Sequence, residues 1–303
     1  MTALLAYIPS PSSGSFELWS HFSIHMYGVM LLIGIAGCIW LTGYRWVKWG
    51  GDWDLVFRMS LWGVIFGIIG ARLYHDITSW NRDPTIHAHW YGFAAVWDGG
   101  LGIWGAIPVG LIAGAIVVRR SGNSVRLMMD AVAPGLLLAQ GIGRWGNYWN
   151  QELYGKPTSL PWGLRIDQAH QTGIDPQYMS TPNQYGYYQP TFLYEFLWDI
   201  AGVGVLLWVD RRFTIKRPAL FALYVIWYTT FRTFEEILRI DPSNHILGMR
   251  VNFWVSLIVW ICAVVFFIWW QFLRGSSSKP EPTPKPRKIE PGPAMAVPKG
   301  RVR

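Results

Sequence analysis

Seven long apolar segments dominate this sequence, and they decide what kind of fold it can adopt. Most have the length that an α-helix needs to cross the roughly 30 Å hydrocarbon core of a bilayer. Within a bilayer the backbone must hydrogen bond to itself, so only helices and closed barrels can span it. The sequence therefore predicts an all-α polytopic membrane protein with seven transmembrane helices. The predicted spans are Ile24–Tyr44, Trp53–Tyr74, Leu101–Val118, Leu127–Ile142, Thr191–Val209, Ala219–Phe234 and Val251–Leu273.

The composition supports this class, because 51% of the residues are hydrophobic and 15% are charged, which is too apolar for an ordinary soluble domain. Cys38 and Cys262 both lie inside apolar segments, where a thiol usually packs as a small hydrophobe. The motifs HExxH, CxxC and GxSxG do not occur in the sequence. We therefore expect neither a metal ion nor a cofactor.

Basic residues collect in alternate loops, and the positive-inside rule makes those loops cytoplasmic. This predicts an amino terminus outside and a carboxyl terminus in the cytoplasm. The formal charge of +8 does not indicate nucleic acid, because eight basic residues lie in the tail from Arg274 onward, where membrane lipid is the expected partner. The basic residues in the loops are Arg45, Lys48, Arg119, Arg120, Arg126, Arg211, Arg212, Lys216 and Arg217.

The predicted domains follow from these spans. Residues 1–274 form the membrane domain, and its outer loop from about Asn147 to Tyr188 is too long for a simple connection, which predicts a small outward-facing head. Residues 275–303 mix Ser, Pro and Lys with few large apolar side chains. Such a segment is expected to be a disordered basic tail.

The polar segment GRWGNYWNQELYG, residues 143–155, ends the fourth apolar segment. A charge at the bilayer centre costs about 2.5–3.5 kcal/mol on insertion scales, so Arg144 is a candidate functional residue. If residues 140–150 continue as helix, then Arg144, Asn147, Tyr148 and Gln151 share one face. That face could hold an anionic headgroup, because guanidinium binds phosphate bidentately. The alternative is a polar clamp between helices.

A second arginine, Arg232, lies in the sixth span and is followed by Glu235, Glu236 and Arg239. These residues could form a structural salt-bridge ladder along one helix. However, two deep arginines from different spans are difficult to pair fully against one adjacent glutamate. We therefore expect Arg144 and Arg232 to converge on one phosphate.

Other polar residues near the predicted outer ends of spans have structural alternatives. Tyr27, next to His25, could be an interfacial anchor of the aromatic belt. Arg72 could extend its charged end to the interface. Asp98, before two glycines, could accept hydrogen bonds at a helix start.

Several motifs together resemble the prolipoprotein diacylglyceryl transferase family. Residues 143–155 are similar to its signature, in which Gly-Arg is followed by two asparagines, a glutamate and a glycine. The resemblance covers about Tyr27 to Leu273, nearly the whole chain except the tail. Its other motifs occur in family order: His25–Gly28, Gly70–Arg72, Trp97–Gly100, Gln189–Glu195 and Phe231–Glu236.

The resemblance implies a bacterial plasma-membrane enzyme that transfers diacylglycerol from phosphatidylglycerol to the lipobox cysteine of a preprolipoprotein signal peptide. A thioether forms and glycerol phosphate leaves. It also implies site residues. The expected catalytic residues are Arg144, Arg232, Tyr27 and Glu236, and the expected substrate-binding residues are Asn147, Asn150, Glu152, Gly155, Arg72, Asp98, His25 and Arg239.

The proton acceptor stays open at this point. Many family members have a histidine after the Trp-Asp-Gly-Gly motif where this chain has Trp104, as some others do. The nucleophile belongs to the substrate, whose thiol must lose its proton to attack. The candidate acceptors are His25, His75, Glu152, Glu236 and the leaving phosphate.

Two other classes of protein remain as alternatives. A transporter or lipid-moving protein would use the arginines as an anion path and would predict paired repeats or broken helices, for which the sequence gives no convincing repeat. An intramembrane protease would need carboxylates such as Asp98 or Glu152 in place of the arginines.

Overall fold

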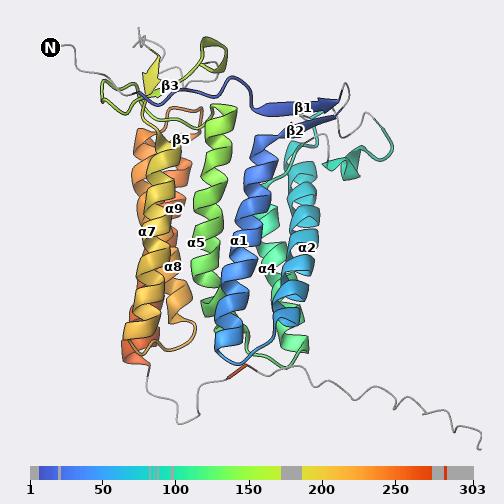
Figure 1. Cartoon of the computed structure of the whole chain (residues 1–303), viewed down its shortest axis with the longest axis vertical. Coiled ribbons are helices and arrows are strands. Elements are labelled where there is room, and N and C mark those ends of the chain that lie inside the picture. Colours follow the sequence, from blue (N-terminus) through green and yellow to red (C-terminus); the bar gives the residue numbers. More distant parts are fainter. Residues whose placement is uncertain are drawn as a thin grey trace, which may run out of the picture. The chain divides into compact units, whose positions relative to one another are not determined.

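The computed structural model describes residues 7–19, 22–81, 83–84, 86, 89–96, 99–171, 186–274 and 283–284. Long helices dominate this part of the chain (Figure 1). They are α1 (Met26–Lys48), α2 (Trp53–Ser79), α4 (Ile103–Arg120), α5 (Val125–Asn150), α7 (Thr191–Arg212), α8 (Ala219–Leu238) and α9 (Val251–Ile268).

Short elements lie between and after the helices. The strands form three antiparallel pairs: β1 (Ser15–Trp19) with β2 (Phe22–His25), β3 (Leu164–Arg165) with β4 (Tyr187–Tyr188), and β5 (His245–Ile246) with β6 (Met249–Arg250). The turns η1 (Gly92–Ala94) and η3 (Gln168–His170) are 3-10 helices, and η4 (Trp269–Leu273) is a π-helical turn.

Six of these helices are long and apolar enough to cross a membrane, which makes the chain a polytopic all-α membrane protein. The predicted number was seven. The exception is α8, because any stretch of 18 residues in it contains Arg232, Glu235 and Glu236. Its charges, rather than its length of 20 residues, separate α8 from the others.

The fourth helix is longer than predicted. Its span was expected to end at Ile142, but α5 continues to Asn150 and therefore carries the polar segment as regular helix. The helix begins after Ser124, whose hydroxyl accepts a hydrogen bond from the Leu127 amide, and ends at Gln151, which adopts a left-handed conformation with φ 51°. Arg144, Asn147 and Tyr148 therefore share a face as predicted, whereas Gln151 ends the helix and does not extend that face.

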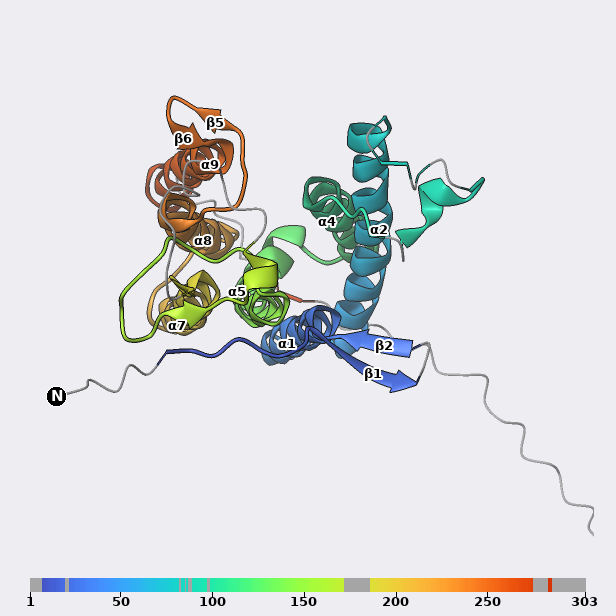
Figure 2. The same ribbon diagram turned by 90° about the horizontal axis from the view of Figure 1, so that it is seen from above.

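The chain divides into two compact units. Unit 1 comprises Met1–Trp46 and Ser124–Pro282, and unit 2 comprises Val47–Asn123 and Thr283–Arg303. Within unit 1, α5, α7, α8 and α9 run side by side (Figures 1 and 2). Unit 2 contains α2 and α4.

Within unit 1, α1 approaches α5 closely at glycines. A Cβ atom on Gly135 would lie 2.9 Å from the backbone oxygen of Cys38. A core between α5, α7 and α8 fills the half of unit 1 that lies away from the polar segment. Its buried members are Ala133, Leu137, Leu206, Ile215, Ala219, Leu220 and Tyr224.

Charged residues hold one end of unit 1, which we call its basic end; it carries Arg45, Arg126, Arg211, Arg212, Arg217 and Arg274. Buried Arg45 pairs with Asp210 at 3.2 Å. Arg217 bridges Asp210 at 2.8 Å and Asp130 at 3.3 Å. These ion pairs connect α1, α5, α7 and the turn before α8.

The opposite end of unit 1, which we call its head end, carries the segment between α5 and α7. Its β3 and β4 strands pair, and Ile8 forms a bridge with Leu164. The buried side chains there form a second small core, of Tyr154, Leu164, Ile166, Tyr188, Phe192 and Ile240. The predicted head spans about residues 147–188, of which 172–185 lie outside the described residues.

In unit 2, α2 and α4 pack through glycines. A Cβ on Gly105 would lie 2.1 Å from the Gly70 carbonyl oxygen, so the two backbones meet directly. Outward faces carry exposed apolar side chains, such as Phe57 and Ile112. Such surfaces are typical of lipid-facing helices.

Candidate active site

The two predicted arginines meet at one buried carboxylate. Glu195, in the second turn of α7, accepts a 2.7 Å hydrogen bond from Nη2 of Arg144 through Oε1. Its Oε2 lies 3.5 Å from Nη1 of Arg232. Because α5 supplies Arg144 and α8 supplies Arg232, Glu195 joins three helices at the head end of unit 1.

From the sequence, one adjacent glutamate was considered as a partner for the two arginines, and the structure supplies three. Besides Glu195, Arg232 pairs with both Glu235 and Glu236 on its own helix. Glu235 lies close enough to Glu195 to interact with it electrostatically, and both contact Arg232, so the carboxylates gather around the same guanidinium group. Sequence spacing identified the contact of Arg232 with Glu236 but not the partners that α7 provides.

Both guanidinium groups nevertheless keep unused donors. A guanidinium has five N–H donors. Arg144 donates one hydrogen bond to Glu195 and one, of 3.4 Å, to Asn147. Arg232 donates to Glu235 and Glu236. Among the described residues, three donors of Arg144 therefore make no hydrogen bond, and Arg232 keeps donors beyond those that face Glu235, Glu236 and Glu195. The two side chains remain 18% and 12% exposed.

A second layer of charge surrounds Glu236. Its Oε2 accepts a 2.8 Å hydrogen bond from Arg250, and its Oε1 accepts from Arg232 and, at 3.5 Å, from Arg239. Arg239 and Arg250 then share Asp241, with nitrogen–oxygen distances of 2.7–2.9 Å. The buried carboxylate of Glu236 therefore accepts hydrogen bonds from three arginines.

The contribution of Asp241 to the stability of the protein should depend on pH. Burial raises its pKa, but the hydrogen bonds and charges of Arg239 and Arg250 outweigh burial and leave the pKa below its usual 3.8. A pKa depressed by folding stabilises the protein above the unfolded-state pKa, and this stability is lost as the pH falls through the folded-state pKa. We expect Asp241→Asn to lower the melting temperature of the solubilised protein at pH 7, and this difference should shrink as the pH falls below about 4 and through the folded-state pKa.

The control is wild-type protein melted in the same detergent across the same pH range. If the difference in melting temperature between the variant and the wild type stayed constant as the pH fell from 7 to well below about 4, this account would be contradicted.

The signature asparagines hold a glutamate next to Arg144. Asn147 donates a 3.0 Å hydrogen bond to Oε1 of Glu152, and Asn150 donates one of 3.3 Å to the same oxygen. Glu152 is exposed, and its Oε2 has no hydrogen-bond partner in the described part of the chain. Arg144, Asn147 and Glu152 thus form a continuous chain of contacts.

Glycines bring two further elements close to this group. A Cβ on Gly146 would lie 2.6 Å from ring atom Cδ2 of Tyr27, so the glycine makes room for the tyrosine beside α5. At Gly155 a Cβ would lie 3.2 Å from the carbonyl oxygen of Leu238. Gly155 also bridges to Arg239, which fixes the segment after α5 against the end of α8.

The remaining predicted residues are placed differently. His25 ends β2, is exposed, and makes no hydrogen bond or ion pair to this group within the described residues. Arg72 belongs to unit 2, where it donates to the carbonyl oxygens of Gly92, Phe93 and Gly99 at 2.6–3.1 Å and pairs with Asp76. These contacts hold the loop after α2. Asp98 lies outside the described residues.

Sequence reasoning did not select several residues that the fold brings to the arginines. Glu195 appeared only as the last residue of the motif Gln189–Glu195, although its position five residues after Pro190, near the start of an apolar helix, was a usable signal. Tyr228, one turn before Arg232, lies close enough to Arg144 and Arg232 to interact electrostatically with both. Asp199, one turn after Glu195, is buried, and neither carboxyl oxygen has a partner in the described part of the protein.

Comparisons with known proteins place the chain in a family. A family model described as prolipoprotein diacylglyceryl transferase matches residues 14–269. Three similar proteins carry the name phosphatidylglycerol–prolipoprotein diacylglyceryl transferase. One from Frankia alni is 48% identical over 86% of this chain and 67% of its own length. One from Streptomyces griseus is 43% identical over 87% of this chain and 78% of its own length, and one from Paenarthrobacter aurescens is 43% identical over 86% and 83%. The chain therefore belongs to the prolipoprotein diacylglyceryl transferase family.

Proposed function

We propose that this membrane transferase of lipoprotein biosynthesis moves the diacylglyceryl group of phosphatidylglycerol to the lipobox cysteine thiol of a preprolipoprotein. A thioether forms and glycerol phosphate leaves. The names of the relatives specify both substrates for those proteins. The observation that carries the proposal for this chain is the convergence of Arg144 and Arg232, each with unused N–H donors, on Glu195.

The proposed membrane arrangement has seven spans and includes α8. The charges that set α8 apart are buried and paired, which lowers the cost of placing them in a membrane. The amino terminus and the head end of unit 1 face outward, and the basic end faces the cytoplasm, as the positive-inside rule requires. Residues 1–274 are proposed as the catalytic domain and 275–303 as a basic cytoplasmic tail.

The phosphate of the lipid binds to the unused donors of Arg144 and Arg232. Glu195 holds the two guanidinium groups near each other, and both stay positively charged at all relevant pH values. They therefore form a preorganised site for a phosphate. As the bond between the glyceryl carbon and the phosphate oxygen breaks, negative charge grows on that oxygen, and nearby donors stabilise it. Tyr27 and Asn147 orient the headgroup, while Glu236 and Arg239 hold Arg232 in place.

The reaction needs a proton acceptor for the substrate thiol. The sulfur forms a bond to the glyceryl carbon, the carbon–oxygen bond to phosphate breaks, and the thiol proton goes to a base. Among the open candidates, the contacts favour Glu152, because one oxygen is fixed by Asn147 and Asn150 while the other is unpaired among the described residues. Glu236 is less suitable because three arginines occupy it. His75 lies in unit 2 and pairs with Asp83 at 2.9 Å.

We expect Glu152→Gln to lower kcat by about 10²–10⁴-fold, the usual contribution of a general base. The amide keeps the size and the contacts with Asn147 and Asn150 but cannot take the proton. Single-turnover transfer to a lipobox peptide measures the effect. Glu152 is exposed, so the variant should keep the melting temperature of the wild type. If kcat were also unchanged, Glu152 would not be the base.

Trp104 tests whether a side chain at the family's histidine position carries protons here. It is 54% exposed in the first turn of α4. We expect Trp104→Ala to lower transfer at all pH values by a similar factor, because indole cannot exchange a proton in this range. Rate profiles from pH 5 to 9 measure this. The disappearance of one limb of the profile in the variant would contradict the expectation.

The function is tested by incubating the purified full-length protein with phosphatidylglycerol and a lipobox peptide and then weighing the peptide by mass spectrometry. A diacylglyceryl mass gain on the cysteine supports transfer. Cleavage of the peptide would support a protease, and an unchanged peptide would favour a transporter or lipid-moving protein. A peptide with serine in place of the lipobox cysteine is the matched control and should gain no mass.

A further inference from the structure

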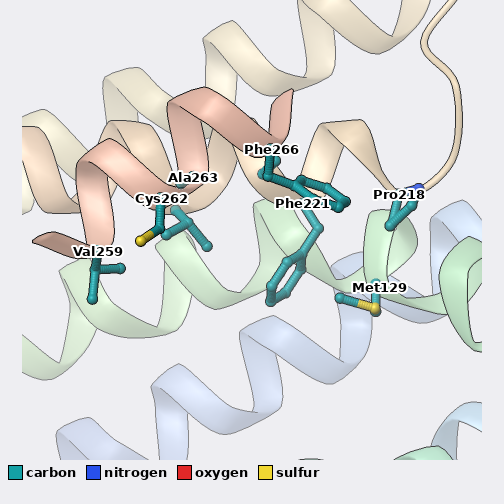
Figure 3. Close-up of a pocket in the computed structure, with 9 residues that line it drawn as sticks. Met129, Pro218, Phe221, Val259, Cys262, Ala263 and Phe266 are labelled. Atoms are coloured by element: carbon teal, nitrogen blue, oxygen red, sulfur yellow. The ribbon is translucent and has the colours of Figure 1, made fainter. Parts of the chain in front are cut away.

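An apolar groove opens between α5, α8 and α9 toward the basic end of unit 1 (Figure 3). Its volume is about 290 Å³, and nine apolar side chains line it. Ligand pockets for drug-sized molecules usually measure about 300–1,000 Å³, so this groove suits one narrow chain. Its lining includes Met129, Pro218, Phe221, Val259, Cys262 and Phe266.

The groove is accessible from the surface and is separate from the arginine site. Val259 is 39% exposed and Cys262 is exposed, so an apolar ligand can enter from the side of α9. Along α8, Phe221 precedes Arg232 by eleven residues, which corresponds to about 16 Å of helix. The groove therefore cannot be part of the phosphate site at the head end.

Two arginines lie at the end of the groove. The guanidinium carbons of Arg126 and Arg274 lie 5.8 Å and 3.9 Å from the centre of the Trp270 ring. Both side chains are exposed, and neither forms an ion pair with a carboxylate in the part of the chain that is described. The Trp270 ring thus gathers two uncompensated positive charges in one place.

Helical spacing connects this charged pair to the groove. Arg126 precedes the lining residue Met129 by three positions on α5, so they share a face. Trp270 follows the lining residue Phe266 by four positions, and their rings stack at 5.3 Å. Trp270 also donates a 3.0 Å hydrogen bond to the Arg217 carbonyl, directly before Pro218 of the lining.

We propose that this groove binds one acyl chain of an anionic phospholipid of the surrounding bilayer, with the lipid phosphate held by Arg126 and Arg274. The apolar lining accounts for the chain, and the paired guanidinium groups account for the anionic headgroup. Basic pockets between transmembrane helices on the cytoplasmic side are suited to anionic headgroups. The site is distinct from the proposed substrate site and does not depend on the proposed function.

The test uses photo-crosslinking of the full-length protein in phosphatidylcholine nanodiscs. The probe is phosphatidic acid with a diazirine in one acyl chain, and the matched probe is phosphatidylcholine with the same chain. Peptide mapping by mass spectrometry separates adducts in the groove from adducts near Arg144. We expect phosphatidic acid to label the segment Val259–Phe266 more strongly than phosphatidylcholine does.

Charge variants test the headgroup contact. The double variant Arg126→Gln with Arg274→Gln should lower groove labelling by phosphatidic acid, by about fivefold for each arginine. The control, Arg211→Gln with Arg212→Gln, makes the same change in net charge at the same end and should keep the labelling. In Ala263→Trp the indole fills the groove, so chain labelling should fall even with both arginines present.

Four results would overturn the proposal. Equal groove labelling by both lipids would show that the headgroup is not recognised. An equal loss of labelling in the two double variants would show that general surface charge, and not Arg126 with Arg274, attracts the lipid. Disulfide-linked dimers through Cys262, formed under mild oxidation in place of lipid adducts, would put a second copy against the groove. If the arginine variant aggregates, Ala263→Trp decides, because unchanged labelling in it would also refute the site.

Discussion

Arg144→Ala and Arg232→Ala are each expected to abolish diacylglyceryl transfer, with a fall in kcat/KM of at least about 10²–10³-fold. Each removes a guanidinium group with unused donors from the proposed phosphate site. The loss should appear as missing mass gain on the lipobox peptide. Because the arginines are proposed to act on the leaving phosphate, kcat should fall as well as affinity for phosphatidylglycerol.

The alanine variants alone do not separate chemistry from folding. Removing one member of a buried ion pair costs about 3–5 kcal/mol, because a carboxylate is left uncompensated. Arg232→Ala would remove a positively charged partner from three buried carboxylates at once, those of Glu195, Glu235 and Glu236. Arg144→Lys and Arg232→Lys keep the charge but lose the planar fork, so they should fold and insert while transfer remains severely reduced.

Arg45 provides the matched control. Its side chain is 5% exposed, so it is more buried than the site arginines, and it pairs with Asp210 at the basic end of unit 1. Arg45→Ala should lower the melting temperature and leave kcat unchanged at temperatures where the protein is folded. Normal thioether formation by folded Arg144→Lys or Arg232→Lys would show that a positive charge suffices and that bidentate contact is not required. Normal activity of either alanine variant would defeat the assignment of the arginines.

Much of the helical frame could be predicted because the bilayer restricts the choices. An apolar run of about 20 residues can hardly be anything but a helix in that environment, and every predicted span overlaps an observed helix. The approach of Arg144 and Arg232 to one common anionic group could also be anticipated. A buried cation is costly unless an anion lies beside it, and one anion can serve two cations. Two arginines on separate helices are therefore expected to lie near the same anion.

The counterion itself could not be predicted. In the sequence-based prediction, phosphate is the group that compensates the arginines, and Glu195 is not considered. Glu195 and Arg144 are 51 positions apart in the sequence, so their contact depends on how α5 and α7 pack. Helical spacing reports neighbours along one helix, which is why it found Glu236 for Arg232 and missed the partner on α7. The same limit explains Tyr27, whose position beside Gly146 depends on the packing of α1 against α5.

The end of α5 shows a related error. Hydropathy placed the end of the fourth span at Ile142, because polar residues follow it. The helix continues because those polar residues have partners: Arg144 meets Glu195, and Asn147 meets Glu152. In a membrane protein, polar residues that are satisfied by neighbouring helices extend a helix as well as apolar ones do. The residues that mislead a hydropathy reading are thus those that build the site.

Glu195→Gln is expected to reduce transfer by at least about 100-fold although Glu195 is not proposed to touch the reacting atoms. Its two oxygens face Arg144 and Arg232, so it sets their separation as a positioning residue. Glutamine keeps the size, but its amide nitrogen must face one of the guanidinium groups, and the negative charge that holds them together is lost. The arginines then repel each other, and the phosphate site is no longer preorganised.

A merely structural role for Glu195 predicts a different pattern. Glu195→Asp keeps the charge but shortens the side chain by one methylene, so the melting temperature should change little while kcat falls and the KM for phosphatidylglycerol rises. If Glu195 only stabilises the fold, activity in both variants should follow the folded fraction, as in Arg45→Ala. Wild-type kcat in folded Glu195→Gln would show that the arginines bind phosphate without a carboxylate between them, and the central geometric argument for the site would fail.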